Sequence, residues 1–383
     1  MKICVTTASG VEAATKRELY KITSIKDLAA IDGRITFEGD IETVAECNLY
    51  LRTANRVEII VGEFKADDFD KLFDGIKAVP WEEYMPKDAS IVVSAKSVMS
   101  KLFAYSAIQS ITKKAICERL KSAYKSIILA ESGSRYKVEA AIRKDIVTVS
   151  IDTSGEGLHR RGYRGLVGEA PLKETLAAAL IDFSVWNPSR PLADLFCGSG
   201  TIPIEACLIA LDIPSGMNRE FDFLGWSDKN REIFDKIKED ARGKIEYDKE
   251  VRISGFDIDE KQLSLARKHA SLAGVAEKIH FQRMDMREFS SRFSHGVIIS
   301  NPPYGERLSE RREIEKLYRD YGKVVKSLDE WCCYTLTSVD DFERLFGRKA
   351  DKKRKIYNGR LECNYYMMLA SPPKSTLKNM PKK

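Results

Sequence analysis

This 383-residue sequence contains no long apolar run, and its first residues do not have the pattern of a signal peptide. No stretch approaches the roughly 18 consecutive apolar residues that a membrane-spanning helix needs. The first ten residues, MKICVTTASG, lack the long apolar core of a signal peptide. We therefore expect no contact with a membrane and a cytoplasmic location.

Paired cysteines and clustered histidines are also missing. The eight cysteines are scattered without a C-x-x-C pair, and the four histidines show no spacing typical of metal ligands. Disulfide frameworks and zinc sites normally show such patterns. The sequence therefore predicts reduced thiols, mostly in the core, and no metal site.

A strong overall charge is absent as well, because the net charge is only +6. Positive charge is nevertheless concentrated in two segments. Residues 95–144 contain eleven Lys and Arg against three Asp and Glu, and residues 341–383 contain twelve against four. The rest of the chain is acidic overall. This distribution favours a polyanionic partner, and nucleic acid in particular.

The chain is too long for one ordinary core, and its pattern changes near residue 170. Before about residue 152, short strands alternate with amphipathic helices, as is typical of α+β folds. Beyond residue 170, the spacing of strands and helices predicts a doubly wound parallel sheet, closed by a hairpin that turns at Asn358-Gly359. Residues 212–250 are charged, and we expect an irregular segment there.

A glycine-rich turn follows the first strand of this second half, in the segment DLFCGSGT at 194–201. Gly198 and Gly200 allow a tight turn and close approach of a ligand. The helix that follows presents free backbone N–H groups at its start. A dinucleotide-binding fingerprint would place a third glycine at position 203, where this chain has Pro203. Alone, the turn is weak evidence, because many strand-to-helix turns contain glycine.

Acidic residues end the next two strands. Asp257 follows the strand in GFDID and could accept hydrogen bonds from both hydroxyls of a ribose. Asp259 has a simpler role as the N-cap of the next helix. Asp285 ends the third strand and could accept from the exocyclic amine of an adenine.

The fourth strand ends in Asn301-Pro302-Pro303-Tyr304. The Asn301 side-chain oxygen and the Pro302 carbonyl could accept from the N–H groups of an exocyclic amine, whose lone pair is otherwise delocalised. Proline fixes the backbone that carries these acceptors, and Tyr304 could stack on a target base turned out of its helix. Four such elements in this order point to one site. A nucleophilic cysteine is absent from the motif.

The ordered series resembles class I S-adenosylmethionine-dependent methyltransferases that modify exocyclic amino nitrogens. The joint DTSGEGLHRRGYRGLVGEAPLKETLAAALI at 152–181 closely resembles that of the RlmL-type ribosomal RNA methyltransferases, which join a THUMP domain to the catalytic domain. Members are also described as N6-adenine-specific DNA methylases. The resemblance covers nearly the whole chain. It implies S-adenosylmethionine as cofactor and large-subunit (23S) ribosomal RNA as partner, with methyl transfer to the N2 amine of a guanine.

The fold implied is a Rossmann-like methyltransferase with a seven-stranded sheet, preceded by an α+β ferredoxin-like and THUMP region. The parts are a ferredoxin-like part (residues 1–60), a THUMP RNA-binding domain (61–155), the methyltransferase domain (165–372) and a flexible tail (373–383). Some relatives carry a second methyltransferase domain behind the first, whereas this sequence stops soon after the closing hairpin. Oligomeric state is not determined by the sequence, and we favour a monomer.

The resemblance also assigns site residues. The catalytic residues implied are Asn301, Pro302 and Tyr304. The cofactor-binding residues implied are Pro171, Leu172, Lys173, Glu174, Asp194, Phe196, Cys197, Gly198, Ser199, Gly200, Thr201, Asp257, Ile258, Asp285, Met286 and Asn301. Three arginines and an aromatic residue within five positions suit phosphate contact and stacking, so we predict RNA contacts at Arg160, Arg161, Tyr163 and Arg164.

Other functions remain open. The same Asn-Pro-Pro-Tyr motif serves N6-adenine methyltransferases and enzymes that methylate the N5 amide of protein glutamine, because each acceptor is an exocyclic or amide nitrogen. A non-catalytic RNA-binding assembly factor is a further alternative. The intact glycine turn and acids argue against that factor, and the basic THUMP-like half favours RNA over protein or DNA.

Overall fold

The structure is a computed structural model, which describes residues 1–22, 27–164, 172–305, 311–328 and 330–370. The chain forms two compact units. The N-terminal unit contains residues 1–7, 16–158 and 219–240, and the C-terminal unit contains residues 8–15, 159–218 and 241–383. Each unit thus includes a segment from the other half of the sequence. The linear division predicted from the sequence does not contain these two exchanges.

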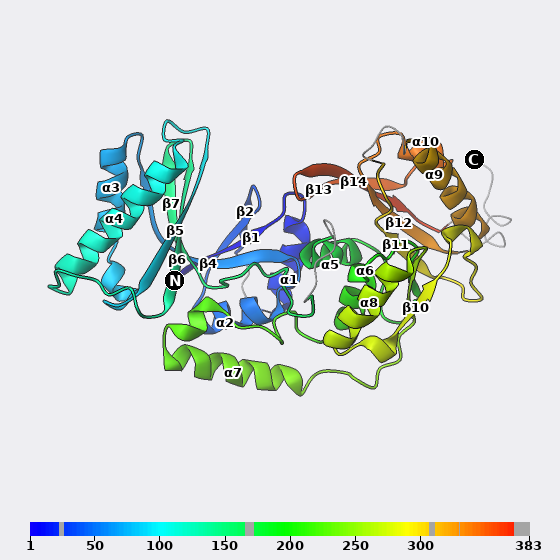
Figure 1. Ribbon diagram of the computed structural model, residues 1–383, viewed down its shortest axis with the longest axis horizontal. Helices are drawn as coiled ribbons and strands as arrows, with labels where there is room; N and C mark the ends of the chain where they lie inside the picture. Colours follow the sequence, from blue (N-terminus) through cyan, green and yellow to red (C-terminus); the bar gives the residue numbers. More distant parts are fainter. Residues whose placement is uncertain (23–26, 165–171, 306–310, 329, 371–383) are drawn as a thin grey trace. The chain divides into compact units, whose positions relative to one another are not determined.

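A single seven-stranded sheet spans the N-terminal unit, in the order β2-β3-β1-β4-β7-β6-β5 (Figure 1). Its ferredoxin-like and THUMP parts are joined by β4, which pairs antiparallel with β1 on one side and β7 on the other. Strand β4 was not predicted from the sequence, although at twelve residues it is long for a strand. The strands are β1 (Lys2–Thr7), β2 (Ala29–Ile31), β3 (Arg34–Glu38), β4 (Ala54–Lys65), β5 (Ser90–Val98), β6 (Arg135–Arg143) and β7 (Ile146–Asp152).

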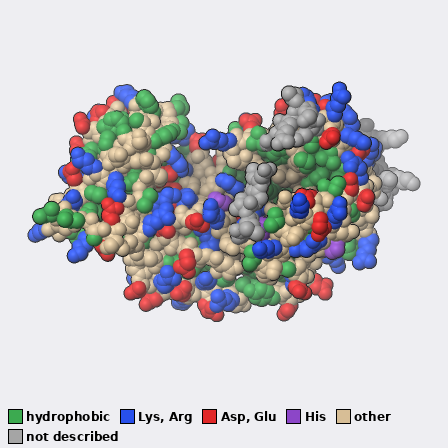
Figure 2. Space-filling view, viewed as in Figure 1, with side chains coloured by type: hydrophobic (Ala, Val, Ile, Leu, Met, Phe, Trp, Pro, Cys, Tyr) green, Lys and Arg blue, Asp and Glu red, His purple; other side chains and the backbone are tan. Residues whose placement is uncertain are grey.

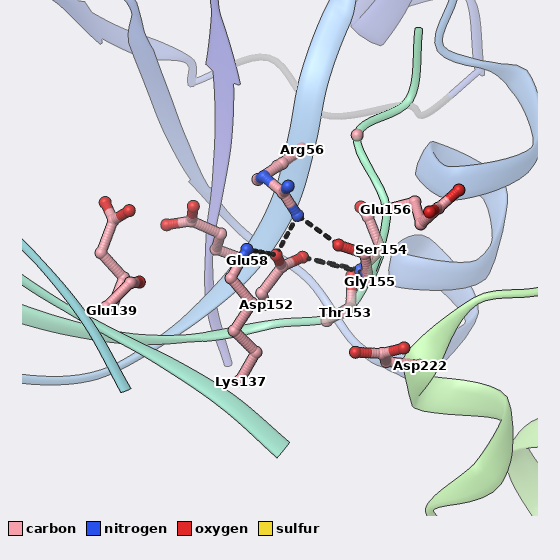
Figure 3. Close-up of polar contacts among 12 residues, drawn as sticks. Arg56, Glu58, Lys137, Glu139, Asp152, Thr153, Ser154, Gly155, Glu156 and Asp222 are labelled. Carbon is pink, nitrogen blue, oxygen red and sulfur yellow. Dashed lines mark hydrogen bonds and ion pairs between the residues drawn. The ribbon is translucent and has the colours of Figure 1, made fainter. Parts of the chain in front are cut away.

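The two faces of this sheet differ because side chains alternate along each strand. Apolar residues such as Val138, Val149 and Ile151 point to a core shared with the helices α3 and α4. The opposite face carries Arg56 and Glu58 from β4 and Asp152 from β7, and Arg56 and Asp152 point toward one another (Figure 3). The helices of this unit include α2 (Ile41–Tyr50), α3 (Phe69–Ala78) and α4 (Tyr105–Ala123), and α1 (Glu12–Ile22) has residues in both units.

The helix α7 (Asp228–Arg242) lies where the sequence analysis expects an irregular segment, so that expectation is wrong. Its buried Phe234 packs edge to face against Phe221 and Phe223, with ring centroids 5.4 and 6.1 Å away. Just before it, Trp226 stacks on Tyr136 of β6 at 4.8 Å. The charged residues of this helix outnumber its apolar ones, which hid the apolar stripe in the sequence.

The C-terminal unit contains a second seven-stranded sheet, in the order β10-β9-β8-β11-β12-β14-β13. The first five strands are parallel, and β14 and β13 form the antiparallel hairpin that was predicted, with Gly359 in its turn at a φ of +65°. This mixed sheet confirms the predicted Rossmann-like class. The strands are β8 (Leu192–Asp194), β9 (Ile253–Asp257), β10 (Ile279–Arg283), β11 (Val297–Ser300), β12 (Cys332–Thr337), β13 (Lys352–Asn358) and β14 (Leu361–Met368).

Helices cover both faces of this sheet, and its central strand β11, with the sequence VIIS, is accordingly apolar and wholly buried. In β11, Val297 and Ile299 face one core, formed with α5, α6 and α8, while Ile298 faces the other, formed with α9 and α10. The helices are α5 (Glu174–Asp182), α6 (Thr201–Ala210), α8 (Glu260–Leu272), α9 (Arg311–Ser327) and α10 (Phe342–Phe346). The predicted N-cap is confirmed, because Asp259 accepts from the Lys261 amide at the start of α8.

Among the described residues no helix is both long enough and apolar enough to cross a membrane. The cytoplasmic location expected from the sequence stays a prediction. The predicted tail at 373–383 lies outside the described residues.

Candidate active site

The predicted site residues gather at the carboxyl edge of the parallel sheet in the C-terminal unit. Strand β8 pairs with β9 on one side and β11 on the other, so the chain reverses its direction of travel across the sheet at β8. Ligands of open α/β sheets bind outside the carboxyl ends of strands at such a switch point. The ends of β10, β9, β8 and β11 lie in this order along the edge, and they carry Asp285, Asp257, Asp194 and Asn301.

The glycine turn after β8 adopts the backbone conformation that glycine favours. Gly198 has a φ of +51° and Gly200 a φ of +84°, both in the left-handed region. A Cβ added at Gly198 would meet no heavy atom within 4 Å, so the space beside it is open. At Gly200 a Cβ would lie 2.9 Å from that of Ala266 in α8. The first glycine therefore leaves room for a ligand, and the second allows close packing.

Asp257 connects the end of β9 to this turn. Its carboxylate accepts from the Gly198 amide at 2.8 Å and from the Asp259 amide at 2.9 Å. Each carboxylate oxygen has a second lone pair, so the half-buried side chain can still accept from ribose hydroxyls. The structure thus brings Asp257 and the glycine turn together, as the cofactor prediction requires.

Asp194 is buried at the end of β8, where it forms a hydrogen bond to the backbone of the glycine turn. Its carboxylate accepts from the Phe196 amide at 3.1 Å. Burial raises the pKa of Asp194 to about 7, with a smaller contribution from the charge of Asp257. Cys197 is also buried, and burial raises the pKa of its thiol, which fits a packing role better than a nucleophilic one.

The helix α8 supports the turn from the other side through His269, which the sequence analysis did not single out. His269 is buried, and its Nδ1 lies 3.1 Å from the carbonyl oxygen of Ser199. Because a carbonyl only accepts, this ring nitrogen must carry the hydrogen. The contact fixes the direction of the peptide between the two glycines, which sets where the turn presents its N–H groups.

The predicted residues at the start of α5 are held by Arg164. Its guanidinium donates to the Leu172 carbonyl at 3.1 Å, pairs with the Glu174 carboxylate at 3.1 Å, and contacts the Thr201 hydroxyl at the start of α6. Arg164 therefore joins two of the segments predicted to bind the cofactor. Lys173 is exposed at the N-cap of α5, and Pro171 lies outside the described residues.

The predicted adenine acceptor, Asp285, is already engaged with a neighbour. Its side chain accepts from the Arg287 amide at 2.9 Å and forms an ion pair with the Arg287 guanidinium at 2.8 Å. Its carboxylate is half-buried and retains lone pairs for a further donor. Ile258 beside it is exposed, whereas Met286 is buried in the core. An adenine contact at Asp285 stays a prediction.

The Asn-Pro-Pro-Tyr segment is braced at several points. The Ser300 hydroxyl, one residue before Asn301, accepts from the Leu195 amide at 3.0 Å and so ties β11 to the glycine turn. The buried Tyr318 of α9 donates to the Pro303 carbonyl at 3.0 Å. Neither Ser300 nor Tyr318 was predicted, because sequence spacing does not indicate these contacts.

Tyr304 makes a contact that differs from the predicted stacking. Its hydroxyl donates to the Asn301 side-chain oxygen, and the Cys363 thiol of β14 donates to that hydroxyl at 3.8 Å. Burial raises the pKa of Tyr304, so the phenol keeps its proton. Tyr304 thus holds the side chain of Asn301, while stacking on a target base stays a prediction.

The structure contradicts part of the predicted RNA contact. Arg161 and Tyr163 are only 4% and 2% exposed. Both bind Glu205 of α6, the guanidinium through two contacts of 3.3 Å and the hydroxyl at 3.0 Å. The prediction is wrong for these two residues, because their polar groups neutralise a buried carboxylate. Arg160 is exposed and stays a predicted contact, and Arg164 holds the cofactor-side segments described above.

Glu205 itself could have been found from the sequence. It is the only charged residue in the apolar helix IPIEACLIAL, and a lone acid on a buried helix requires a partner. The three arginines of HRRGYR are a clustered upstream source of one. His269 and Tyr318 carry no comparable signal.

The residues present fit S-adenosylmethionine. The open space at Gly198, the remaining lone pairs of Asp257 and the acceptors of Asn301 all lie on one edge of the sheet. Gly198, Asp257 and Asp285 would hold the cofactor there, with Leu172 and Thr201 near the turn.

Three stretches of the chain match known families. Residues 2–58 match the RlmL ferredoxin-like domain, residues 66–152 the THUMP domain, and residues 161–367 the RMKL-like methyltransferase domain. The last match alone covers more than half of the chain.

Individual relatives agree with these matches. The chain is 41% identical over 366 residues to the "Putative RNA methyltransferase YpsC" of Bacillus subtilis, covering 95% of this chain and 94% of that protein. It is 34% identical over 380 residues to the Ribosomal RNA large subunit methyltransferase K/L of Syntrophotalea carbinolica, covering 95% of this chain but 53% of that protein. The chain thus spans about half the length of this second relative.

A solved structure of a similar protein contains the demethylated form of the cofactor. The crystal structure of SMU.472 complexed with S-adenosylhomocysteine (SAH) is 41% identical, with a TM-score of 0.93 over 97% of this chain and 99% of that one. SAH is what remains after S-adenosylmethionine gives up its methyl group. The chain belongs to the RlmL-like, THUMP-containing family of RNA methyltransferases that use S-adenosylmethionine.

Proposed function

We propose that the protein methylates the exocyclic N2 of a guanine in large-subunit (23S) ribosomal RNA. The observation that carries the proposal is Asn301 at the end of β11, followed by Pro302 and held by Tyr304. The choice of ribosomal RNA is supported by the 34% identity to a large-subunit methyltransferase. That relative is about twice as long, so its activity is an expectation for this chain.

The acceptors of this motif address the main chemical difficulty of the reaction. The lone pair of an exocyclic amine is delocalised into the base, which makes the nitrogen a poor nucleophile. Two acceptors aimed at its N–H groups favour a pyramidal nitrogen whose lone pair faces the methyl donor. The Asn301 oxygen and the Pro302 carbonyl can provide them. The cofactor supplies a methyl group on a positively charged sulfur.

Preorganisation of Asn301 follows from its neighbours. A carboxamide oxygen has two lone pairs, so it can accept from Tyr304 and still accept from the substrate amine. The contact between Tyr318 and Pro303 holds the backbone, and that between Ser300 and Leu195 fixes β11 against the glycine turn. Acceptors held before the substrate arrives need no reorganisation during methyl transfer.

A methyl-transfer assay tests the proposal. Purified protein and labelled S-adenosylmethionine are incubated with large-subunit RNA from cells that lack the gene, followed by nucleoside analysis. Label in N2-methylguanosine is the expected result. Label in N6-methyladenosine would retain the site but contradict the base. No labelled nucleoside, with the cofactor still bound, would contradict the proposed substrate and favour a protein glutamine or a non-catalytic role.

A further inference from the structure

The loop between β5 and α4, residues 98–105, exposes apolar side chains to an unusual degree. Phe103 is 78% exposed, Met99 74%, Val98 57% and Tyr105 54%. Large apolar side chains are normally buried, and a contiguous exposed group marks an interaction site. Ile146 continues the group, because Arg143 pairs with both Val98 and Ile146 in the sheet. Figure 2 shows hydrophobic side chains gathered at this end of the N-terminal unit.

The loop is held firmly although its tips are exposed. Leu102 is buried, and the Asp145 carboxylate accepts from the Ser100 hydroxyl at 2.7 Å and from the Lys101 amide at 2.9 Å. The Lys144 amide donates to the Val98 carbonyl at 3.2 Å. These bonds bind the loop to the turn between β6 and β7. Phe103 therefore stays exposed on a braced backbone, which lowers the entropic cost of binding a partner.

Basic residues slightly outnumber acidic ones around the loop. Five basic residues lie on it or beside it in the sheet, against four acidic ones that lie on the loop or pair with these basic residues, and the first turn of α4 contains no acid. The basic residues are Lys65, Lys96, Lys101, Arg143 and Lys144, and the acidic ones are Asp32, Asp67, Glu139 and Asp145. This excess matches a partner that carries negative charge along its length.

We propose that the β5–α4 loop is a stacking platform for unpaired nucleotides of the RNA substrate. Phe103 and Tyr105 provide the aromatic faces on which bases stack, and the surrounding lysines contact the phosphates. Aromatic rings among basic residues, rather than aliphatic side chains alone, favour RNA over a protein partner. The inference rests on membership of an RNA methyltransferase family and not on which base is methylated.

RNA binding by the full-length chain tests this inference. The probes are a fluorescein-labelled, unstructured CA-repeat oligoribonucleotide and a blunt-ended RNA duplex of the same length, followed by fluorescence anisotropy. The double variant Phe103→Ala with Tyr105→Ala is expected to bind the single strand about fivefold more weakly or worse. Phe103→Trp keeps an aromatic face and is expected to retain the affinity.

A matched control comes from the other end of α4. Ile127 and Ile128 are 89% and 76% exposed in the same unit but are aliphatic. The double variant Ile127→Ala with Ile128→Ala is expected to change the affinity by less than about twofold. Circular dichroism checks that both double variants are folded.

Two results would overturn the inference. One is full affinity of the Phe103 and Tyr105 double variant for the single strand, which would leave the loop to a protein partner. The other is an equal loss with the duplex, which would indicate backbone contact without stacking. Neither result depends on nucleoside analysis, so failure of the platform and failure of the proposed methylation site are distinguishable.

Discussion

Two buried carboxylates, one in each unit, are accommodated in different ways. In the C-terminal unit, Glu205 is fully buried and receives both a guanidinium from Arg161 and a hydroxyl from Tyr163. In the N-terminal unit, Glu58 is 1% exposed and accepts from the Ser150 hydroxyl at 2.8 Å. A buried charge is stable only with a partner. The first carboxylate is therefore matched by a cation, and the second has a pKa that is raised to about 7.

The surroundings of Glu58 explain the difference. Asp152 on the neighbouring strand forms ion pairs with Arg56 and Lys137 (Figure 3). Glu139 forms ion pairs with Arg34 and Lys96. The cations of this face are thus paired with the other two carboxylates. Burial, followed by the charge of Glu139, raises the pKa of Glu58 to about 7. Pairing with a cation thus fixes Glu205 in a buried ion pair, whereas Glu58 is left as a titratable group.

The largest effect is expected from removing Glu205, which breaks its buried contacts with Arg161 and Tyr163. Glu205→Ala leaves the Arg161 guanidinium buried without its counter-charge, and we expect the free energy of unfolding to fall by about 3–5 kcal/mol. Urea denaturation measures it. The control is Glu315→Ala, which removes an exposed pair with Arg319 on α9 and should cost about 0.3–0.5 kcal/mol. Equal losses of unfolding free energy in the two variants would contradict the proposed stabilisation by the buried Arg161–Glu205 pair.

The next largest effect is expected from removing the proposed contact between Asn301 and the substrate amine. Asn301→Ala removes one preorganised acceptor, which should raise the barrier to methyl transfer by about 2.7–4 kcal/mol. Binding of S-adenosylmethionine, measured by calorimetry, should persist because the glycine turn and Asp257 are unchanged. A variant with full activity would show that Asn301 has no part in the reaction.

Titration of Glu58 is expected to change the free energy of unfolding with pH by a similar or smaller amount. Because the pKa of Glu58 is raised from 4.5 to about 7, the native state binds its proton more tightly than the unfolded chain does. The stabilisation is complete below pH 4.5 and is lost as the pH rises through 7, which amounts to on the order of 3 kcal/mol.

Unfolding curves between pH 4 and 8 for the wild type and Glu58→Gln test this expectation. Asp194, whose pKa is also raised to about 7, adds a slope of the same sign, so the difference between the two proteins isolates Glu58. Identical pH dependence in both proteins would show that Glu58 titrates in the same way folded and unfolded.

The smallest effect is expected from the Tyr304 hydroxyl. Tyr304→Phe keeps the ring but removes the hydrogen bond to Asn301, which is worth about 0.5–1.5 kcal/mol, so kcat should fall by about two- to tenfold. If Tyr304 acts only by stacking, Phe would preserve kcat. Tyr304→Ala removes both contributions, and comparing the two variants separates stacking from positioning.

The site was predictable from the sequence because its residues follow strands. Glycine turn, Asp257, Asp285 and Asn301 each end a strand of a parallel sheet, and parallel strands bring their carboxyl ends to one edge. The N-cap at Asp259 and the hairpin turn at Gly359 were also predictable, since both depend on local backbone preferences. Local signals and strand order thus predicted the ligand-binding edge and the motif, and the resemblance of these residues to known methyltransferases identified the family.

Tertiary structure alone decided how distant side chains are used. Arg161 and Tyr163 have the composition of an RNA contact, yet they fold inward because Glu205, more than forty positions away, needs them. The exchange of residues 8–15 and 219–240 between the units, and the pairing of β4 with both β1 and β7, likewise depend on long-range contacts. The sequence shows that Arg161 and Tyr163 can bind RNA, but the buried carboxylate of Glu205 determines that they bind within the protein.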